Sequence, residues 1–343
     1  MKLRVGVIGI GAAWQSRHLP ALRALGDRYQ VVAVCDPVQH RAAAVARELN
    51  AQVSDGFRAL TCRNDVDAVL LLSAKWFGEL PIHAACDYGK AVYCSAALEL
   101  EDTQAAQLRE RLEKAGVAFM AEFPCRLSPA TLRLKELIAT RLGPPRLLFC
   151  NRRRITSNKN EGQKLEKTSR CGRDLVELID WCRYLVEGEP TALTSTRFNS
   201  SASRSSIAQS DLPTTDYFSV NLDFSSEKNP GSGPIATISC GQYIPRSWGE
   251  SLSYRRPADL KVVCERGIAF VDLPNTVSWF DDAGHHLESL EHERPVGEQL
   301  LLHFHRAVES LVLKSSSLED AHRAICIANR AIEFANQGHR VLC

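Results

Sequence analysis

The chain opens with a strand-like run that leads into a glycine loop, and this feature most restricts the fold. Leu3 to Ile8 is largely apolar and is followed by Gly9-Ile10-Gly11, after which helical spacing begins near His18. A second apolar run, 31–35, ends at Asp36. A strand, a glycine loop and a helix, followed by a strand that ends in an acidic residue, are typical of a fold that holds a dinucleotide.

Each residue of this loop has a physical role in that interpretation. Gly9 permits the tight turn, and Gly11 lets the backbone approach a pyrophosphate. The helix N-terminus, with Ala12 and Ala13, offers free N–H groups to that anion. Asp36 lies where an acidic residue accepts hydrogen bonds from the adenosine ribose hydroxyls.

Asp36 favours NAD, because its negative charge opposes a 2′-phosphate, whereas Arg41 softens that preference and leaves NADP open. Trp14 stands where the fingerprint places its third small residue. We expect either an indole that swings out to the domain cleft or one that blocks the cofactor site.

The pattern of the chain changes near Phe123. Strand and helix patterns alternate before it, with strands expected at 3–8, 31–35, 66–72, 91–94 and 117–121 and helices at 18–25, 42–49, 82–88 and 102–115. This alternation predicts a parallel sheet with helices on both faces. After a helix at 129–141, strand patterns dominate, with helices only at 174–185, 298–312 and 318–336. We therefore predict an α/β protein: a Rossmann domain over 1–122 and an α/β domain with a large open, mostly antiparallel sheet over 123–343.

Bulk composition excludes several classes of protein. The 343 residues carry a formal net charge of +2, so no global field favours nucleic acid or a membrane. No uncharged apolar run reaches the roughly 18–20 residues that span a bilayer, and the glycine loop comes too soon for a secretory signal. The 12 cysteines form no Cys-x-x-Cys pair, so we expect no metal site and a cytoplasmic, reducing location.

Several further segments resemble the Gfo/Idh/MocA family of oxidoreductases. The resemblance rests on Val5 to Leu22, on Gly89 to Cys94, on Arg126-Leu-Ser-Pro129 and on Arg183-Tyr-Leu185, in the family's order and spacing. It implies a Rossmann domain with NAD (or NADP), a second domain with a large sheet, polyol or sugar substrates, and homo-oligomers built through that sheet. It also implies a role for Ser73 beside the cofactor.

The residues that carry the family's chemistry are absent. In the family, a lysine and a histidine move the hydroxyl proton, helped by an aspartate four residues before the histidine. Ala96, flanked by Ser95 and Ala97, occupies the lysine position; Glu177 occupies the histidine position and Arg173 the aspartate position. The sequence therefore argues against ordinary sugar or polyol dehydrogenation.

Two residues are candidate substitutes for the missing pair. Lys75 follows the third long strand, although a solvated loop lysine is the simpler interpretation. Glu177 has the chemistry of a base, although an ion pair with Arg173, four residues away, is simpler. The basic segment 146–173 indicates either an anionic small-molecule ligand or a solvated loop.

Two hypotheses about function follow. The first is an NAD(P)-binding oxidoreductase with atypical chemistry. The second is a catalytically inactive family member, a pseudoenzyme that serves as a binding or regulatory subunit with a catalytic paralogue. The residues expected to bind the cofactor in both are Gly9, Gly11, Ala12, Ala13, Asp36 and Ser73.

Overall fold

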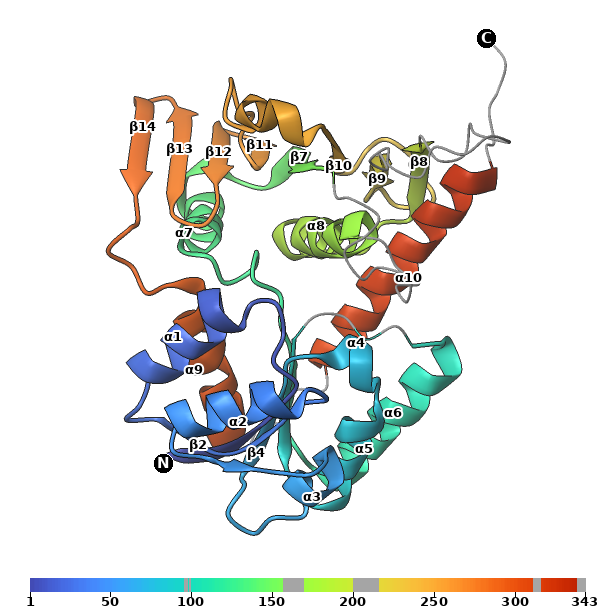
Figure 1. Cartoon of the computed structure of the whole chain (residues 1–343). Helices are drawn as coiled ribbons and strands as arrows, with labels where there is room; N and C mark the ends of the chain where they lie inside the picture. The colour runs from blue at the N-terminus through green and yellow to red at the C-terminus, as the bar shows by residue number, and fades with distance from the viewer. Residues whose placement is uncertain (96–97, 99, 157–169, 200–215, 311–315, 338–343) are drawn as a thin grey trace. The chain divides into compact units, whose positions relative to one another are not determined.

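The computed structural model describes residues 1–95, 98, 100–156, 170–199, 216–310 and 316–337 (Figure 1). They form two compact units. The first comprises residues 1–127 and 294–325, and the second comprises 128–293 and 326–343. Each unit contains one sheet, so the predicted α/β class with two different sheets is confirmed.

The first unit contains a six-stranded parallel sheet in the order β3-β2-β1-β4-β5-β6. The strands are β1 (Leu3–Ile8), β2 (Tyr29–Cys35), β3 (Gln52–Val53), β4 (Ala68–Leu71), β5 (Ala91–Cys94) and β6 (Phe119–Ala121). This is the order of the Rossmann fold, in which the chain reverses its winding direction between β1 and β4. Ligands of such sheets bind at the carboxyl ends of the strands at this point.

Helices cover both faces of this sheet. One face packs against α1 (Leu19–Ala24), α2 (Gln39–Glu48) and α9 (Val296–Glu309), through side chains that include Val5, Leu70 and Tyr93. The opposite face packs against α3 (Phe57–Thr61), α5 (Leu80–Asp87), α6 (Asp102–Ala115) and the start of α10 (Ser316–Gln337). Strands buried on both faces explain the continuous apolar runs in the sequence.

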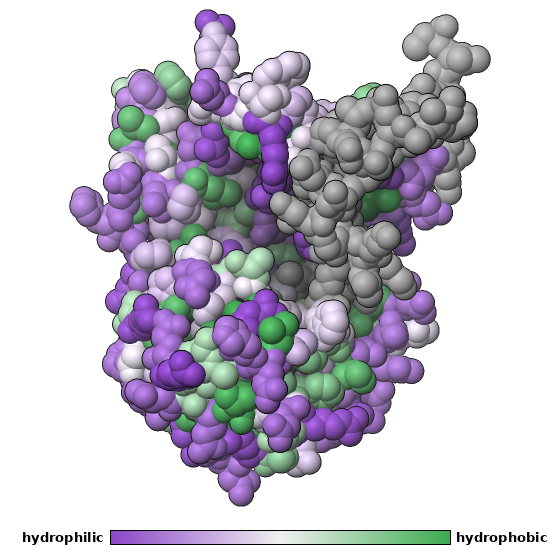
Figure 2. All heavy atoms as spheres, viewed as in Figure 1, coloured by the Kyte–Doolittle hydropathy of each residue, from purple (hydrophilic) through white to green (hydrophobic). Residues whose placement is uncertain are grey.

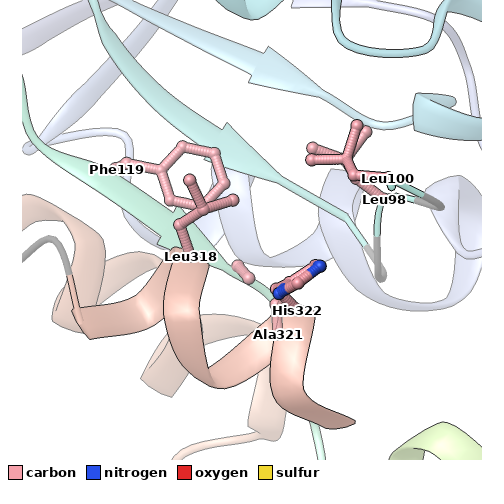
Figure 3. A pocket seen from close by; sticks show the side chains of 7 residues that line it. Leu98, Leu100, Phe119, Leu318, Ala321 and His322 are labelled. Carbon is pink, nitrogen blue, oxygen red and sulfur yellow. The ribbon is translucent and has the colours of Figure 1, made fainter. Parts of the chain in front are cut away.

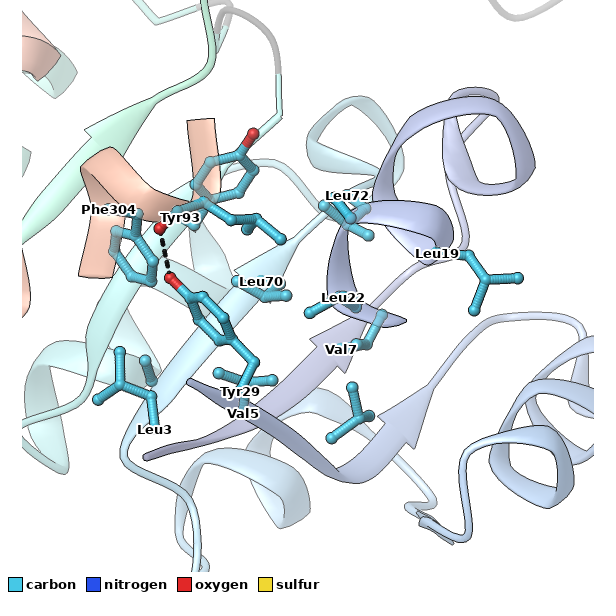
Figure 4. Packing of buried hydrophobic residues seen from close by; sticks show 14 of the residues in the cluster. Leu3, Val5, Val7, Leu19, Leu22, Tyr29, Leu70, Leu72, Tyr93 and Phe304 are labelled. Atoms are coloured by element: carbon cyan, nitrogen blue, oxygen red, sulfur yellow. Dashed lines mark hydrogen bonds between the residues drawn. The ribbon is translucent and has the colours of Figure 1, made fainter. Parts of the chain in front are cut away.

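Residues 294–325 pack with the first unit although they follow the second in the sequence. Leu300, Leu301 and Phe304 of α9 are almost fully buried in the core drawn in Figure 4. There, the Tyr29 hydroxyl donates a hydrogen bond of 2.6 Å to the Leu301 carbonyl. This packing differs from the predicted domain limits, 1–122 and 123–343, because the apolar face of α9 completes the first core.

The second unit contains an eight-stranded sheet in the order β14-β13-β12-β11-β7-β10-β9-β8. All neighbouring strands are antiparallel except β7 and β10. The strands are β7 (Pro145–Ile155), β8 (Ala192–Asn199), β9 (Asp216–Asp223), β10 (Ile235–Ile244), β11 (Leu260–Cys264), β12 (Ile268–Asp272), β13 (Thr276–Asp281) and β14 (Gly284–Ser289).

Two helices cover one face of the second sheet. Helix α8 (Arg170–Val186) packs on β7, β9 and β10, and α7 (Pro129–Leu137) packs on β12 and β13. Leu148, Ile238 and Val262 are fully buried on this face. The alternation of buried and partly exposed residues along β10 and β11 leaves the opposite face partly exposed.

Two helices differ from the predicted ones at their ends. The expected helix 18–25 is preceded by a π-helical turn, Trp14–His18, and the helix expected at 129–141 ends in a π-helical turn, Ile138–Leu142. In the described part of the chain, no helix is both long and apolar enough to cross a bilayer. Hydrophilic side chains cover most of the face drawn in Figure 2.

Candidate functional site

The glycine loop lies at the carboxyl end of β1, beside the carboxyl end of β4. Gly9 has a φ of +76°, and a Cβ atom there would lie 2.4 Å from the Ser73 Cβ. A Cβ atom on Gly11 would lie 2.2 Å from the Leu72 carbonyl oxygen. Both glycines are therefore required for the loop to pack against the segment after β4, and Gly9 also for its left-handed backbone.

The loop leaves a row of backbone donors without partners. The N–H groups of Gly11, Ala12 and Ala13 have no hydrogen-bond partner among the described residues, whereas the Trp14 N–H donates to the Gly11 carbonyl at 3.1 Å. Ala12 is exposed, and Gly11 and Ala13 are partly so. Three consecutive free N–H groups at the start of a helix suit a phosphate, so the loop fits the pyrophosphate of a dinucleotide.

Asp36 lies directly after β2, with its carboxylate turned toward the loop. Its Oδ2 atom accepts a hydrogen bond of 2.7 Å from the Ile10 N–H. Its Oδ1 atom accepts from the Val38 N–H at 2.8 Å and from the Arg41 guanidinium at 2.9 and 3.1 Å. The carboxylate therefore connects the glycine loop to the first turn of α2.

A pocket of about 290 Å³ lies beside this carboxylate, at the carboxyl ends of β2 and β3. Asp36, Pro37, Asp55, Trp76 and Phe77 are among its lining residues. Its volume is close to the lower limit of small-molecule sites. Its place next to the glycine loop suits the adenosine half of a dinucleotide.

Trp14 adopts neither of the two expected positions. Its side chain is 2% exposed and belongs to the core between the sheet and α1, α2 and α9. The indole thus fills the interior of the first unit instead of turning out to solvent.

A buried ion cluster lies behind the loop and was not expected from the sequence. Glu122 follows β6 and is 3% exposed; one carboxylate oxygen pairs with the Arg17 guanidinium and the other lies 3.0 Å from His18 Nε2. Arg17 and His18 belong to the π-helical turn after the glycine loop. The cluster therefore ties that turn to the end of β6, and the acidic residue after a buried strand was its one signal in the sequence.

The stretch expected to lack catalytic groups is described in part. Ala96 and Ala97 lie outside the described residues. The Ser95 N–H donates to the Leu71 carbonyl at 2.9 Å, which continues the pairing of β5 with β4. Cys94 is fully buried, and burial raises the pKa of its thiol, so it packs as an inert side chain. Lys75 lies in the short helix α4 (Ala74–Phe77).

In the second unit, the residues at the expected histidine position form a charged cluster. Glu177 on α8 pairs with Arg152 of β7. Asp174, one turn earlier, accepts hydrogen bonds from Arg152 at 3.2 Å and from Arg154 at 2.6 Å. The hydrogen bond to Asp174 raises the pKa of Arg154. The arginines of β7 nearest to α8 are thus compensated by carboxylates.

A second, much smaller cavity lies in the first unit between β6 and α10 (Figure 3). Leu98, Phe119, Leu318 and His322 are among its lining residues, and its volume is about 10 Å³. This space holds about one water molecule. It is too small for a cofactor or substrate.

Comparisons with known proteins agree with this geometry. The profile of GFO_IDH_MocA, the oxidoreductase family with an NAD-binding Rossmann fold, matches residues 3–123. D-xylose 1-dehydrogenase (NADP(+)) 2 of Haloferax volcanii is 31% identical over 144 residues, covering 40% of this chain and 42% of that protein. Inositol 2-dehydrogenase 3 of Saccharopolyspora erythraea is 29% identical over 191 residues, covering 55% of each. The matches thus span about half the length of these relatives.

The likeness in fold extends further than the likeness in sequence. An oxidoreductase from Agrobacterium radiobacter, solved in complex with NAD+, L-tartaric acid and magnesium, has a TM-score of 0.76 and 15% identity, with 99% of this chain and 98% of that one covered. The profile match over residues 3–123 and the shared fold over nearly the whole chain together identify this protein as a member of the NAD(P)-binding Gfo/Idh/MocA oxidoreductase family.

Proposed function

We propose that this protein binds NAD(P)(H) and transfers a hydride between the nicotinamide and a small hydroxyl or carbonyl compound without the family's lysine–histidine pair. The observation that carries the proposal is the row of free N–H groups at Gly11, Ala12 and Ala13, at the point where Rossmann folds bind their ligands. These donors have no other use in the described structure.

The proposed roles of the residues follow from their positions. The N–H groups of residues 11–13 bind the pyrophosphate, while Gly9 and Ser73 keep the loop against the end of β4. Asp36 holds the loop and borders the adenosine pocket. A bound nicotinamide supplies the hydride donor or acceptor. The group that moves the substrate proton is unassigned; Lys75 and Glu177 stay candidates, and Glu177 is already paired with Arg152.

The proposed substrate is a small polyhydroxylated compound. The relatives are named for xylose and inositol, which are of this class. Arg152 and Arg154 have carboxylate partners, and Arg146 pairs with Glu265 at 3.4 Å. These pairs favour a neutral ligand over the anionic one that the basic segment suggested.

Two measurements separate the two hypotheses about function. Calorimetric titration with NADH and NADPH is expected to give saturable binding, and no binding at millimolar cofactor would overturn the proposal. A panel of polyols, sugars and their carbonyl forms then tests turnover. Binding without any turnover, together with a stable protein partner in pull-downs, would instead support an inactive binding or regulatory subunit.

We also propose a cytoplasmic homo-oligomer that forms through the exposed face of the second sheet. Leu147 and Phe280 are 38% and 48% exposed, and Tyr243 is 37% exposed. Partly exposed apolar side chains on a sheet face favour burial against another copy. Light scattering after size exclusion tests this, and a monomer at micromolar concentration would contradict it.

A further inference from the structure

The adenosine pocket presents Asp36 in an unusual state. The Asp36 side chain is 0% exposed although the residue lines the pocket. Both carboxylate oxygens already accept hydrogen bonds, one from the Ile10 N–H and the other from the Val38 N–H and Arg41. A ribose hydroxyl reaches this carboxylate only by displacing one of these donors. Asp36 is therefore occupied as a brace between the glycine loop and α2.

Arg41 lies on the solvent side of this brace. Its side chain is 49% exposed, and only its Nε and Nη2 atoms donate to Asp36. The Nη1 atom has no hydrogen-bond partner in the described part of the chain. The guanidinium is thus oriented by Asp36 and keeps free donors, which is the arrangement that binds a phosphate well.

The remaining charges at the pocket act in both directions. Arg41 is the third residue of α2, so the positive end of the helix dipole adds to its charge. Asp55 is exposed on the pocket wall and opposes an anion. The charge of Asp36 is compensated by two N–H groups and by Arg41, so it opposes a phosphate less than its position in the sequence suggests.

We propose that Arg41 binds the 2′-phosphate of NADP(H), and that Asp36 positions Arg41 instead of selecting NAD through the ribose hydroxyls. This inference rests on the proposed cofactor binding. It reverses the NAD preference expected from the sequence. Because it concerns the pocket alone, it does not depend on the substrate or on turnover.

Direct binding measurements test the proposal. Calorimetry with NADPH, NADH, 2′,5′-ADP and 5′-AMP separates the 2′-phosphate from the rest of the cofactor. We expect the wild type to bind NADPH more tightly than NADH, and 2′,5′-ADP more tightly than 5′-AMP. Arg41→Ala is expected to weaken NADPH and 2′,5′-ADP by about 10- to 100-fold, the worth of a charge-assisted hydrogen bond, and NADH by less than about 3-fold.

Three variants make the test specific. Arg41→Lys is expected to recover part of the NADPH affinity, because it keeps the charge and loses the fork of donors. Asp55→Asn is expected to tighten NADPH more than NADH. Arg47→Ala, an exposed arginine later in the same helix, is the matched control and is expected to change neither.

The possible failures are distinguishable. Tighter binding of NADH than of NADPH in the wild type, or equal weakening of both by Arg41→Ala, would overturn this inference alone. Absence of binding by every ligand would overturn the proposed function as well.

Discussion

The glycine loop of the first unit and the arginine cluster of the second contain comparable polar groups, but they satisfy them differently. At the loop, the N–H groups of residues 11–13 have no partner in the described structure and are accessible. At the cluster, Arg152 and Arg154 are compensated by Asp174 and Glu177 within the same unit. Folding alone rarely leaves donors unpaired, so the loop is prepared for a ligand and the cluster is complete without one.

The largest effect is expected where the loop approaches β4. In Gly11→Val, the new Cβ atom would meet the Leu72 carbonyl at 2.2 Å, so the loop must move and its free N–H groups lose their alignment. Loss of even one charge-assisted bond to phosphate costs about 1.5–3 kcal/mol, and we expect NAD(P)H affinity to fall by about 100-fold or more as several bonds are lost.

Calorimetric titration measures this affinity, and melting curves show whether the variant folds. Gly188→Ala is the control, because its nearest neighbour, Val186, would lie at an ordinary 3.7 Å. Retained affinity in Gly11→Val would mean that the open N–H groups are not the binding site.

The next largest effect concerns the closed cluster behind the loop. Glu122→Gln removes the charge that compensates Arg17 in the interior. Removing one partner of a buried ion pair costs about 3 kcal/mol or more, and we expect a corresponding loss in the free energy of unfolding in urea. Glu110→Gln, at an exposed pair with Lys114 on α6, is expected to leave the unfolding midpoint unchanged. Equal effects of both variants would contradict a structural role for Glu122.

The same carboxylate gives a pH dependence with a definite sign. Burial by itself raises the pKa of Glu122, but the hydrogen bond with His18 and the charges of His18 and Arg17 outweigh it, so the pKa lies below 4.5. A lowered pKa stabilises the fold at pH values above 4.5, and this stabilisation is lost as the pH falls through the folded-state value. The stability difference between the wild type and E122Q should therefore shrink below pH 4.5. A constant difference across an acid series of urea titrations would exclude this linkage.

The smallest effect is expected at the cluster of the second unit. Because Glu177 is held by Arg152, Glu177→Gln should change turnover by less than about 2-fold, whereas loss of a general base costs about 10²–10⁴-fold. The kcat on whichever panel compound is active decides between these values. A fall of 100-fold or more would make Glu177 the base and would show that the cluster is not complete in itself.

Local patterns predicted most of the first unit. The strand at 91–94 and the helix at 102–115 have the predicted limits. The helix begins in a capping box between Glu101 and Gln104 and ends at Gly116, whose φ is +61°. Such signals are contained in a few neighbouring residues, so sequence reasoning can find them. The two-residue strand β3 and the exposed edge strand β14 lack an apolar pattern and were not predicted.

The site could be predicted only in outline. Gly9, Gly11 and Asp36 were recognised by their spacing, and the structure brings all three to the end of the same sheet. The partners of these residues could not be predicted. That Gly11 faces Leu72 depends on how strands far apart in the sequence pair.

The sequence by itself determined the family, the two kinds of sheet and the absence of the usual lysine and histidine, because each of these is a matter of residue type and local spacing. Only the tertiary structure decided that Trp14 fills the core, that α9 returns to the first unit, that Glu122 holds the turn after the glycine loop, and that Asp36 is occupied by Arg41. These are long-range contacts, and they form because buried polar and apolar groups must all find partners at once when the chain packs.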